Sequence, residues 1–179
     1  MFLDDGLGGG DNFDNCLKIS ERVKSGLLDL GFLLAHEKCN WTPVQNIQWL
    51  GYLWNTQLGK VFVCDQRINK LEGRIKDILQ KFAIGRMFFF VKTLASIVGQ
   101  LISMHLVLGN IVRFHTRFLY FCIFDKASWY SPVKLTQPAL NELQFWDKHC
   151  RILNNEGISF TGQSFDNVCD LEFFVMPQM

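Results

Sequence analysis

Two adjacent aspartates stand near the start of the chain, in the sequence Phe2-Leu3-Asp4-Asp5. Two apolar residues followed by Asp-Asp-Gly predict a short strand that ends in a tight turn. Neighbouring carboxylates repel each other unless a divalent cation screens them, and this density of oxygen ligands suits Mg²⁺. A pair of such ions stabilises the entering and leaving oxygens in nucleotidyl transfer. Asp4 is the expected main metal ligand and Asp5 a second one, although Asp-Asp-Gly is also an ordinary turn sequence.

The elements around this turn are expected to be a mixture of strands and one helix. The glycine-rich segment 6–10 predicts a turn or loop. Apolar residues at helical spacing predict a helix over about 13–30. Two β-rich runs, 47–54 and 60–64, predict a hairpin closed by the loop 55–59.

From Asp65 onward the pattern becomes helical. Helices are expected from Asp65 to a break at Gly85, over about 89–107 and 110–124, and from the Thr136-Gln137-Pro138 start to about Cys150. The first helix carries an apolar stripe at Ile68, Leu71, Ile75 and Ile78. The uncharged run 93–112 is long enough to span a bilayer, but its polar residues favour a core helix, so no membrane contact is expected. The expected fold class is α+β.

The charge is unevenly distributed along the chain. Residues 67–119 carry 9 basic and 2 acidic side chains, whereas the segments before and after them are net acidic. A basic region between acidic ones predicts a local contact with a polyanion, and a solvated helical face is the alternative. The six cysteines show no metal or disulfide spacing, which indicates free thiols in a reducing compartment. The acidic start is unlike a secretion signal, so an intracellular location is expected.

Three ordered elements resemble the palm of a reverse transcriptase. They are the Phe2-Leu3-Asp4-Asp5 box, the Leu30-Gly31-Phe32 segment that runs to Lys38, and the Trp49-Leu50-Gly51-Tyr52 segment, which is similar to a primer-grip hairpin. Segments 98–104, 113–117 and 143–147 resemble the thumb and connection of retrotransposon polymerases, particularly the tyrosine-recombinase (DIRS-like) group. The resemblance covers roughly residues 1–160.

This resemblance implies a partial antiparallel palm sheet with one crossing helix over 1–64, a helical thumb over 65–130, and a connection over 131–179 that ends in the start of a ribonuclease H domain. It implies that Asp4 and Asp5 bind two Mg²⁺ ions and that Lys38 lies near the incoming deoxynucleoside triphosphate. Trp49, Leu50, Gly51 and Tyr52 would position the primer. A further set of basic residues would contact the template–primer phosphates: Lys70, Arg74, Lys81, Arg86, Lys92, Arg113 and Arg117.

The expected function is therefore that of a fragment of an RNA-directed DNA polymerase. The family places a third carboxylate on an earlier palm strand, and Asp11 and Asp14 are too close to Asp5 in sequence to replace it. For this reason the isolated chain is expected to be inactive in nucleotidyl transfer. The alternatives are a non-catalytic nucleic-acid-binding remnant and a membrane-associated helical protein that uses segment 93–112.

Overall fold

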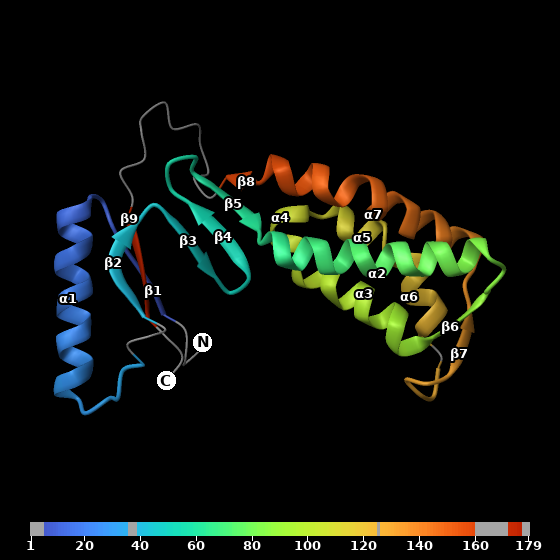
Figure 1. The fold of residues 1–179 in the computed structure, drawn as a ribbon, viewed down its shortest axis with the longest axis horizontal. Helices are drawn as coiled ribbons and strands as arrows, with labels where there is room; N and C mark the ends of the chain where they lie inside the picture. Colours follow the sequence, from blue (N-terminus) through green and yellow to red (C-terminus); the bar gives the residue numbers. More distant parts are fainter. Residues whose placement is uncertain (1–5, 36–38, 125, 160–171, 177–179) are drawn as a thin grey trace. The chain divides into compact units, whose positions relative to one another are not determined.

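The fold consists of antiparallel sheets and helices, which confirms the predicted α+β class (Figure 1). The computed structural model of the chain describes residues 6–35, 39–124, 126–159 and 172–176. The chain divides into two compact units: Met1–Phe62 with Ser159–Met179, and Val63–Ile158. Segment 131–179 does not form a unit of its own, because its long helix belongs to the second unit.

One sheet of the first unit has three strands in the order β1-β9-β2. Strand β1 (Gly6–Gly10) pairs antiparallel with β9 (Glu172–Met176), and β2 (Asn40–Val44) pairs with the other edge of β9. Helix α1 (Phe13–Asp29) packs along this sheet (Figure 1). Its first turn is capped by the side chain of Asn12, which accepts a hydrogen bond from the backbone N–H of Asn15 at 2.9 Å, as polar N-cap residues commonly do.

The loop predicted over Gly6–Gly10 is wrong, because these glycines form strand β1. Every residue from Gly6 to Gly10 has a backbone partner on β9, a strand that local sequence patterns do not reveal. Glycine at position 10 also lets α1 approach closely. A Cβ atom there would lie 2.7 Å from the backbone nitrogen of Cys16, which is closer than side-chain carbons are found. The missing side chain is therefore a condition for this packing.

The second sheet has the order β3-β4-β5-β8. Its strands are β3 (Asn46–Trp49), β4 (Tyr52–Asn55), β5 (Lys60–Val63) and β8 (Ile158–Ser159). The predicted turn between β4 and β5 is confirmed, and the Asn55 side chain accepts a hydrogen bond from the backbone N–H of Leu58 at 2.8 Å. The prediction of one continuous strand over 47–54 is wrong, since this segment folds back on itself as the β3–β4 hairpin.

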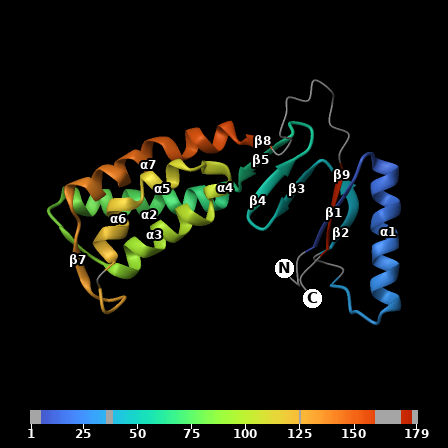
Figure 2. The same ribbon diagram turned by 180° about the vertical axis from the view of Figure 1, so that it is seen from behind.

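The second unit is built around four helices that contact one another in a ring. They are α2 (Asp65–Ala83), α3 (Val91–Ser103), α6 (Arg117–Ile123) and α7 (Gln137–Glu156). Helix α2 contacts α3 and α7, and α6 contacts the same two helices. Viewed from behind, the short helices α4 (His105–Leu108) and α5 (Ile111–Phe114) lead from α3 to α6 (Figure 2). The predicted apolar stripe of α2 is confirmed as part of the core: Ile68, Leu71, Ile75 and Ile78 are fully buried.

The helices predicted over 89–107 and 110–124 are shorter than expected. Residues 88–90 form strand β6 (Phe88–Phe90), which pairs antiparallel with β7 (Pro132–Lys134). Gly109 adopts a φ of 76° and separates α4 from α5, and this backbone conformation suits glycine. Helix α7 is longer than predicted and ends at Glu156 instead of Cys150. Within the described ranges, none of the helices combines the length and the apolar character that a membrane span requires.

Polar side chains in the last two turns of α7 bind α2 and the end of β5. Arg151 donates to both carboxylate oxygens of Glu72 on α2, at 3.0 and 2.8 Å, and to Asn69 at 2.7 Å. The buried side chain of Asn154 accepts from the N–H of Val63 at 2.7 Å and donates to the Val63 carbonyl at 3.1 Å. It therefore satisfies both backbone groups of the last residue of β5. Beside these contacts, burial raises the pKa of the Cys150 thiol to about 12, because an apolar environment disfavours the thiolate.

Near the N-terminal end of α7, Glu142 binds the first turn of α6. Its side chain is 4% exposed, and its two carboxylate oxygens accept hydrogen bonds from the backbone N–H groups of Phe118 and Leu119 at 2.9 and 2.8 Å. These N–H groups belong to the first turn of α6, where helical N–H groups have no intrahelical acceptor. The negative charge also interacts favourably with the positive end of the helix dipole. One buried carboxylate therefore caps α6 and fixes it to α7.

We predict that Glu142→Ala lowers the free energy of unfolding by about 3 kcal/mol, because two charge-assisted hydrogen bonds are removed and the N–H of Leu119 stays buried. Glu142→Gln keeps one accepting oxygen and should lose about half as much. Urea unfolding followed by the helical circular dichroism signal measures both changes. Gln144→Ala, on the exposed side of the same helix, should change stability by less than about 0.5 kcal/mol. Equal stability of the Glu142 and Gln144 variants would contradict the capping role.

Candidate nucleic-acid interface

The β3–β4 hairpin places the predicted primer-positioning residues at a tight turn. Trp49 pairs with Tyr52, and Leu50 and Gly51 form the two-residue connection. Both connecting residues have positive φ angles, 49° at Leu50 and 78° at Gly51, as a type I′ turn requires. Gly51 adopts this conformation readily, but a bulky apolar residue with positive φ is uncommon and strained. A leucine is therefore held at the tip at the expense of local stability.

The strands behind this tip carry aromatic residues on one face. Ile47 and Trp49 alternate with outward residues on β3, and their partners on β4 are Trp54 and Tyr52. The Trp49 and Trp54 rings lie 5.9 Å apart at 59°, a favourable tilted arrangement. Among the described residues, the buried indole N–H of Trp49 has no hydrogen-bond acceptor. Such a group is rare in folded proteins unless water or a ligand satisfies it.

The predicted catalytic residues Asp4, Asp5 and Lys38 lie outside the described residues. Within the described part of the chain, no three His, Cys, Asp or Glu residues come together in a group that could hold a metal ion. The structure therefore provides no geometry for the Mg²⁺ ions that the aspartate pair implies.

One row of basic side chains runs along α2. Lys70, Arg74 and Lys81 are spaced so that they share one side of the helix. Arg74 donates to the hydroxyl of Ser96 on α3, which draws its guanidinium toward that helix. Lys70 is exposed to solvent. Lys81 is neutralised by an ion pair with Asp77, one turn before it on the same helix, at 2.6 Å.

Arg67 belongs to the same row, although it is not among the predicted binding residues. Its Nη2 donates to the hydroxyl of Ser103 at 2.7 Å and to the Ser103 carbonyl at 3.3 Å. Its position seven residues before Arg74 is the sequence signal that identifies it, because residues at that spacing share one side of a helix. Arg67 thus reaches the C-terminal end of α3, and Arg74 reaches its middle.

A second group of basic side chains lies along the opposite edge of α3. Arg113 of α5, Arg117 of α6 and His105 of α4 line a pocket of about 360 Å³ together with Val98 and Ile102 of α3. The guanidinium of Arg117 lies 5.5 Å from the ring centre of Phe121. This cation–π contact keeps the charge at the pocket wall.

The two groups of cations therefore flank the exposed side of α3. Ser96, which Arg74 contacts, and Ile102, which lies in the pocket beside Arg117, are on opposite edges of that side by helical spacing. At the start of α3, Lys92 is exposed and lies 5.8 Å from the ring centre of Tyr130. Arg86 precedes β6, donates to the carbonyl of Phe88 at 3.2 Å and stacks over Phe89.

The segment between α2 and α6 supplies only positive charge to the surface around α3. No Asp or Glu occurs between Asp77 and Asp125, a stretch that contains five of the seven predicted phosphate contacts. Two acidic residues of α2, Asp65 and Glu72, lie on the flank where Arg151 of α7 binds them. The third, Asp77, shares the side of Lys70 and Lys81 and pairs with Lys81. The seven predicted residues thus lie in one unit, whereas the hairpin residues belong to the other unit.

Comparisons of the chain with protein-family models, with curated proteins and with solved structures find no match.

We predict that Leu50→Asn raises the free energy of unfolding by about 0.5–1 kcal/mol, because Asn-Gly is the preferred pair in a type I′ turn. Gly51→Ala should lower it by about 1 kcal/mol, since alanine is strained at positive φ. Thermal unfolding monitored by tryptophan fluorescence reports both effects through the Trp49–Trp54 pair.

Leu58→Asn in the neighbouring turn is the matched control for this prediction. Leu58 is 62% exposed, so the substitution should be nearly neutral. A destabilising Leu50→Asn would contradict the type I′ geometry of the β3–β4 turn.

Proposed function

We propose that the chain is the template–primer-binding part of an RNA-directed DNA polymerase, and that α3 and the basic side chains on both sides of it contact the phosphates of a nucleic-acid duplex. The observation that carries this proposal is the arrangement of Lys70 and Arg74 along one edge of α3 and of Arg113 and Arg117 along the other. Two rows of cations with a neutral strip between them suit a phosphate backbone, which is held mainly by charge.

The exposed residues of α3 itself fit this role. Between the cations Gly99 is exposed, and beyond its own helix no atom lies within 4 Å of where a side chain there would begin. A residue without a side chain lets a nucleic-acid strand approach the helix closely. These contacts depend on the nucleic-acid backbone alone, so we expect binding with little sequence preference.

The hairpin supports the polymerase part of the proposal. The Trp49–Trp54 pair packs behind the Leu50-Gly51 tip, and a strained residue at a tip is a feature of functional sites. In this proposal the tip positions the primer end. Asp4 and Asp5 would hold Mg²⁺, which screens charge in the transferring phosphoryl group, and Lys38 would neutralise the departing pyrophosphate.

The alternative is nucleic-acid binding without catalysis, because the basic surface around α3 supports both functions equally. Primer extension on a primed RNA template with Mg²⁺ tests the catalytic role. Extension that is lost in Asp4→Asn would assign the enzyme, whereas duplex binding without extension is the result expected both of an inactive polymerase part and of the binding protein.

For the duplex-binding surface, we predict that Lys70→Ala with Arg113→Ala weakens binding of an RNA/DNA duplex equally for all sequences. Raising the salt from about 50 to about 200 mM should weaken wild-type binding steeply, and the double substitution should flatten the salt slope by about 0.9 for each phosphate that the protein no longer neutralises. Fluorescence anisotropy of a labelled duplex measures both quantities.

The matched control is Lys76→Ala with Lys148→Ala, which removes the same charge from exposed positions on α2 and α7. Lys81→Ala should have a smaller effect than Lys70→Ala, because Asp77 already neutralises Lys81. If the control pair weakened binding as much as the Lys70/Arg113 pair, the surface around α3 would not be the binding site.

A further inference from the structure

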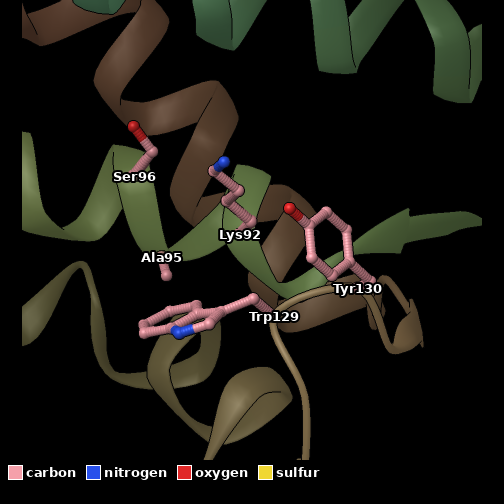
Figure 3. A pocket seen from close by; sticks show the side chains of 5 residues that line it. All are labelled: Lys92, Ala95, Ser96, Trp129 and Tyr130. Atoms are coloured by element: carbon pink, nitrogen blue, oxygen red, sulfur yellow. The ribbon is translucent and has the colours of Figure 1, made fainter.

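We propose that a pocket at the first turn of α3 binds one unpaired nucleotide of a single-stranded nucleic acid, with the base against Trp129 and Tyr130 and the phosphate at Lys92. The pocket has a volume of about 470 Å³ and is lined by Lys92, Ala95, Ser96, Trp129 and Tyr130 (Figure 3). This volume is typical of sites for small ligands. The inference rests on the proposed function in one respect, the choice of nucleic acid as the ligand. The binding of a base and a phosphate is argued from the side chains that line the pocket.

The two aromatic side chains of the pocket are open to solvent. Trp129 is 62% exposed and Tyr130 is 69% exposed. Figure 3 shows the Trp129 indole extending beneath Ala95 and the Tyr130 ring standing beside Lys92. Large aromatic surfaces in water are unfavourable unless a partner covers them, and adjacent exposed rings are typical of binding sites.

The backbone that carries these rings is nonetheless fixed. The N–H of Lys92 donates to the carbonyl of Trp129 at 2.9 Å, and the N–H of Val91 donates to the carbonyl of Ser131 at 3.1 Å. Ser131 also donates to the carbonyl of Ser128 at 3.1 Å, and the next residues enter the β6–β7 ribbon. The segment from Ser128 to Ser131 is therefore anchored to the start of α3. A ligand that stacks there does not have to order the backbone first.

The residues around the rings favour a ligand that is both aromatic and anionic. The ammonium of Lys92 lies 5.8 Å from the Tyr130 ring centre, so a phosphate and a base can be bound within one nucleotide's length. Arg74 is hydrogen-bonded to Ser96 in the pocket wall and adds a second cation. The pocket also lies at the positive end of α3, which favours anions.

Stacking on aromatic side chains accepts every base, because every base has a π-face. Bases inside a duplex are already stacked on their neighbours and cannot enter such a pocket without being flipped out. The pocket therefore fits an unpaired nucleotide, as found in a single-stranded template, better than it fits a base pair.

The test uses the full chain with three probes: a short oligo(dA) single strand, a blunt RNA/DNA duplex and free dAMP. Binding of oligo(dA) should quench tryptophan fluorescence, and Trp129→Ala should weaken that binding about tenfold, as expected for the loss of one stacked base. Tyr130→Ala and Lys92→Gln should weaken it as well, and Trp129→Phe should keep most of the affinity. Phe13→Ala and Lys148→Ala are the matched controls, since they remove an exposed ring and an exposed ammonium elsewhere.

Oligo(dA) binding that is unchanged in both Trp129→Ala and Tyr130→Ala would overturn the proposal, as would a chain that does not bind oligo(dA). Equal affinity for dAMP and oligo(dA) would overturn the assignment to a strand. The blunt duplex separates this proposal from the proposed function: its affinity should depend on Lys70 and Arg113 and not on Trp129. A wild-type chain that does not bind the duplex but binds oligo(dA) in a Trp129-dependent way would overturn the proposed function and support the pocket.

Discussion

The first turn of α6 is held against α7 by a buried carboxylate, that of Glu142. A buried charge is costly unless hydrogen bonds compensate it, so the carboxylate is favourable only when the first turn of α6 lies directly against α7. The contacts of Arg151 with Glu72 and of Asn154 with Val63 act in the same way near the other end of α7. With α6 and α2 both held by α7, the apolar residues of α2, α3 and α6 can close one core.

Helix α2 holds its acidic residues in ion pairs, and α3 has no acidic residue. Arg151 of α7 pairs with Asp65 and Glu72 on one flank of α2, and Lys81 pairs with Asp77. Arg117 lies beside α3 because Glu142 fixes the helix that carries it, and Arg74 lies beside α3 because Ser96 binds it. The basic surface thus depends on how the helices are capped and paired, and the position of Arg117 would change if α6 moved.

Local patterns are sufficient to predict α1, α2, the start of α7 and the β4–β5 turn, because helical spacing, caps and turn residues act within a few positions. They are insufficient for β1, whose glycines become a strand only by pairing with β9 more than a hundred residues later. They also miss the β3–β4 turn, since a leucine at positive φ is not a turn signal. The sequence predicts Lys70, Lys81 and Lys92 as phosphate contacts, but it does not reveal that Asp77 neutralises Lys81 or that Trp129 and Tyr130 border Lys92.

Contact between nucleic acid and the exposed side of α3 is the claim on which the proposed function depends. Acetylation of surface lysines, quantified by mass spectrometry with and without a saturating RNA/DNA duplex, tests it most directly, because Lys70, Lys76, Lys92 and Lys148 are all exposed in the free chain. We predict that the duplex protects Lys70 and Lys92, which border α3, and leaves Lys76 and Lys148 as reactive as before. Protection of Lys76 and Lys148 with Lys70 and Lys92 still reactive would contradict the claim.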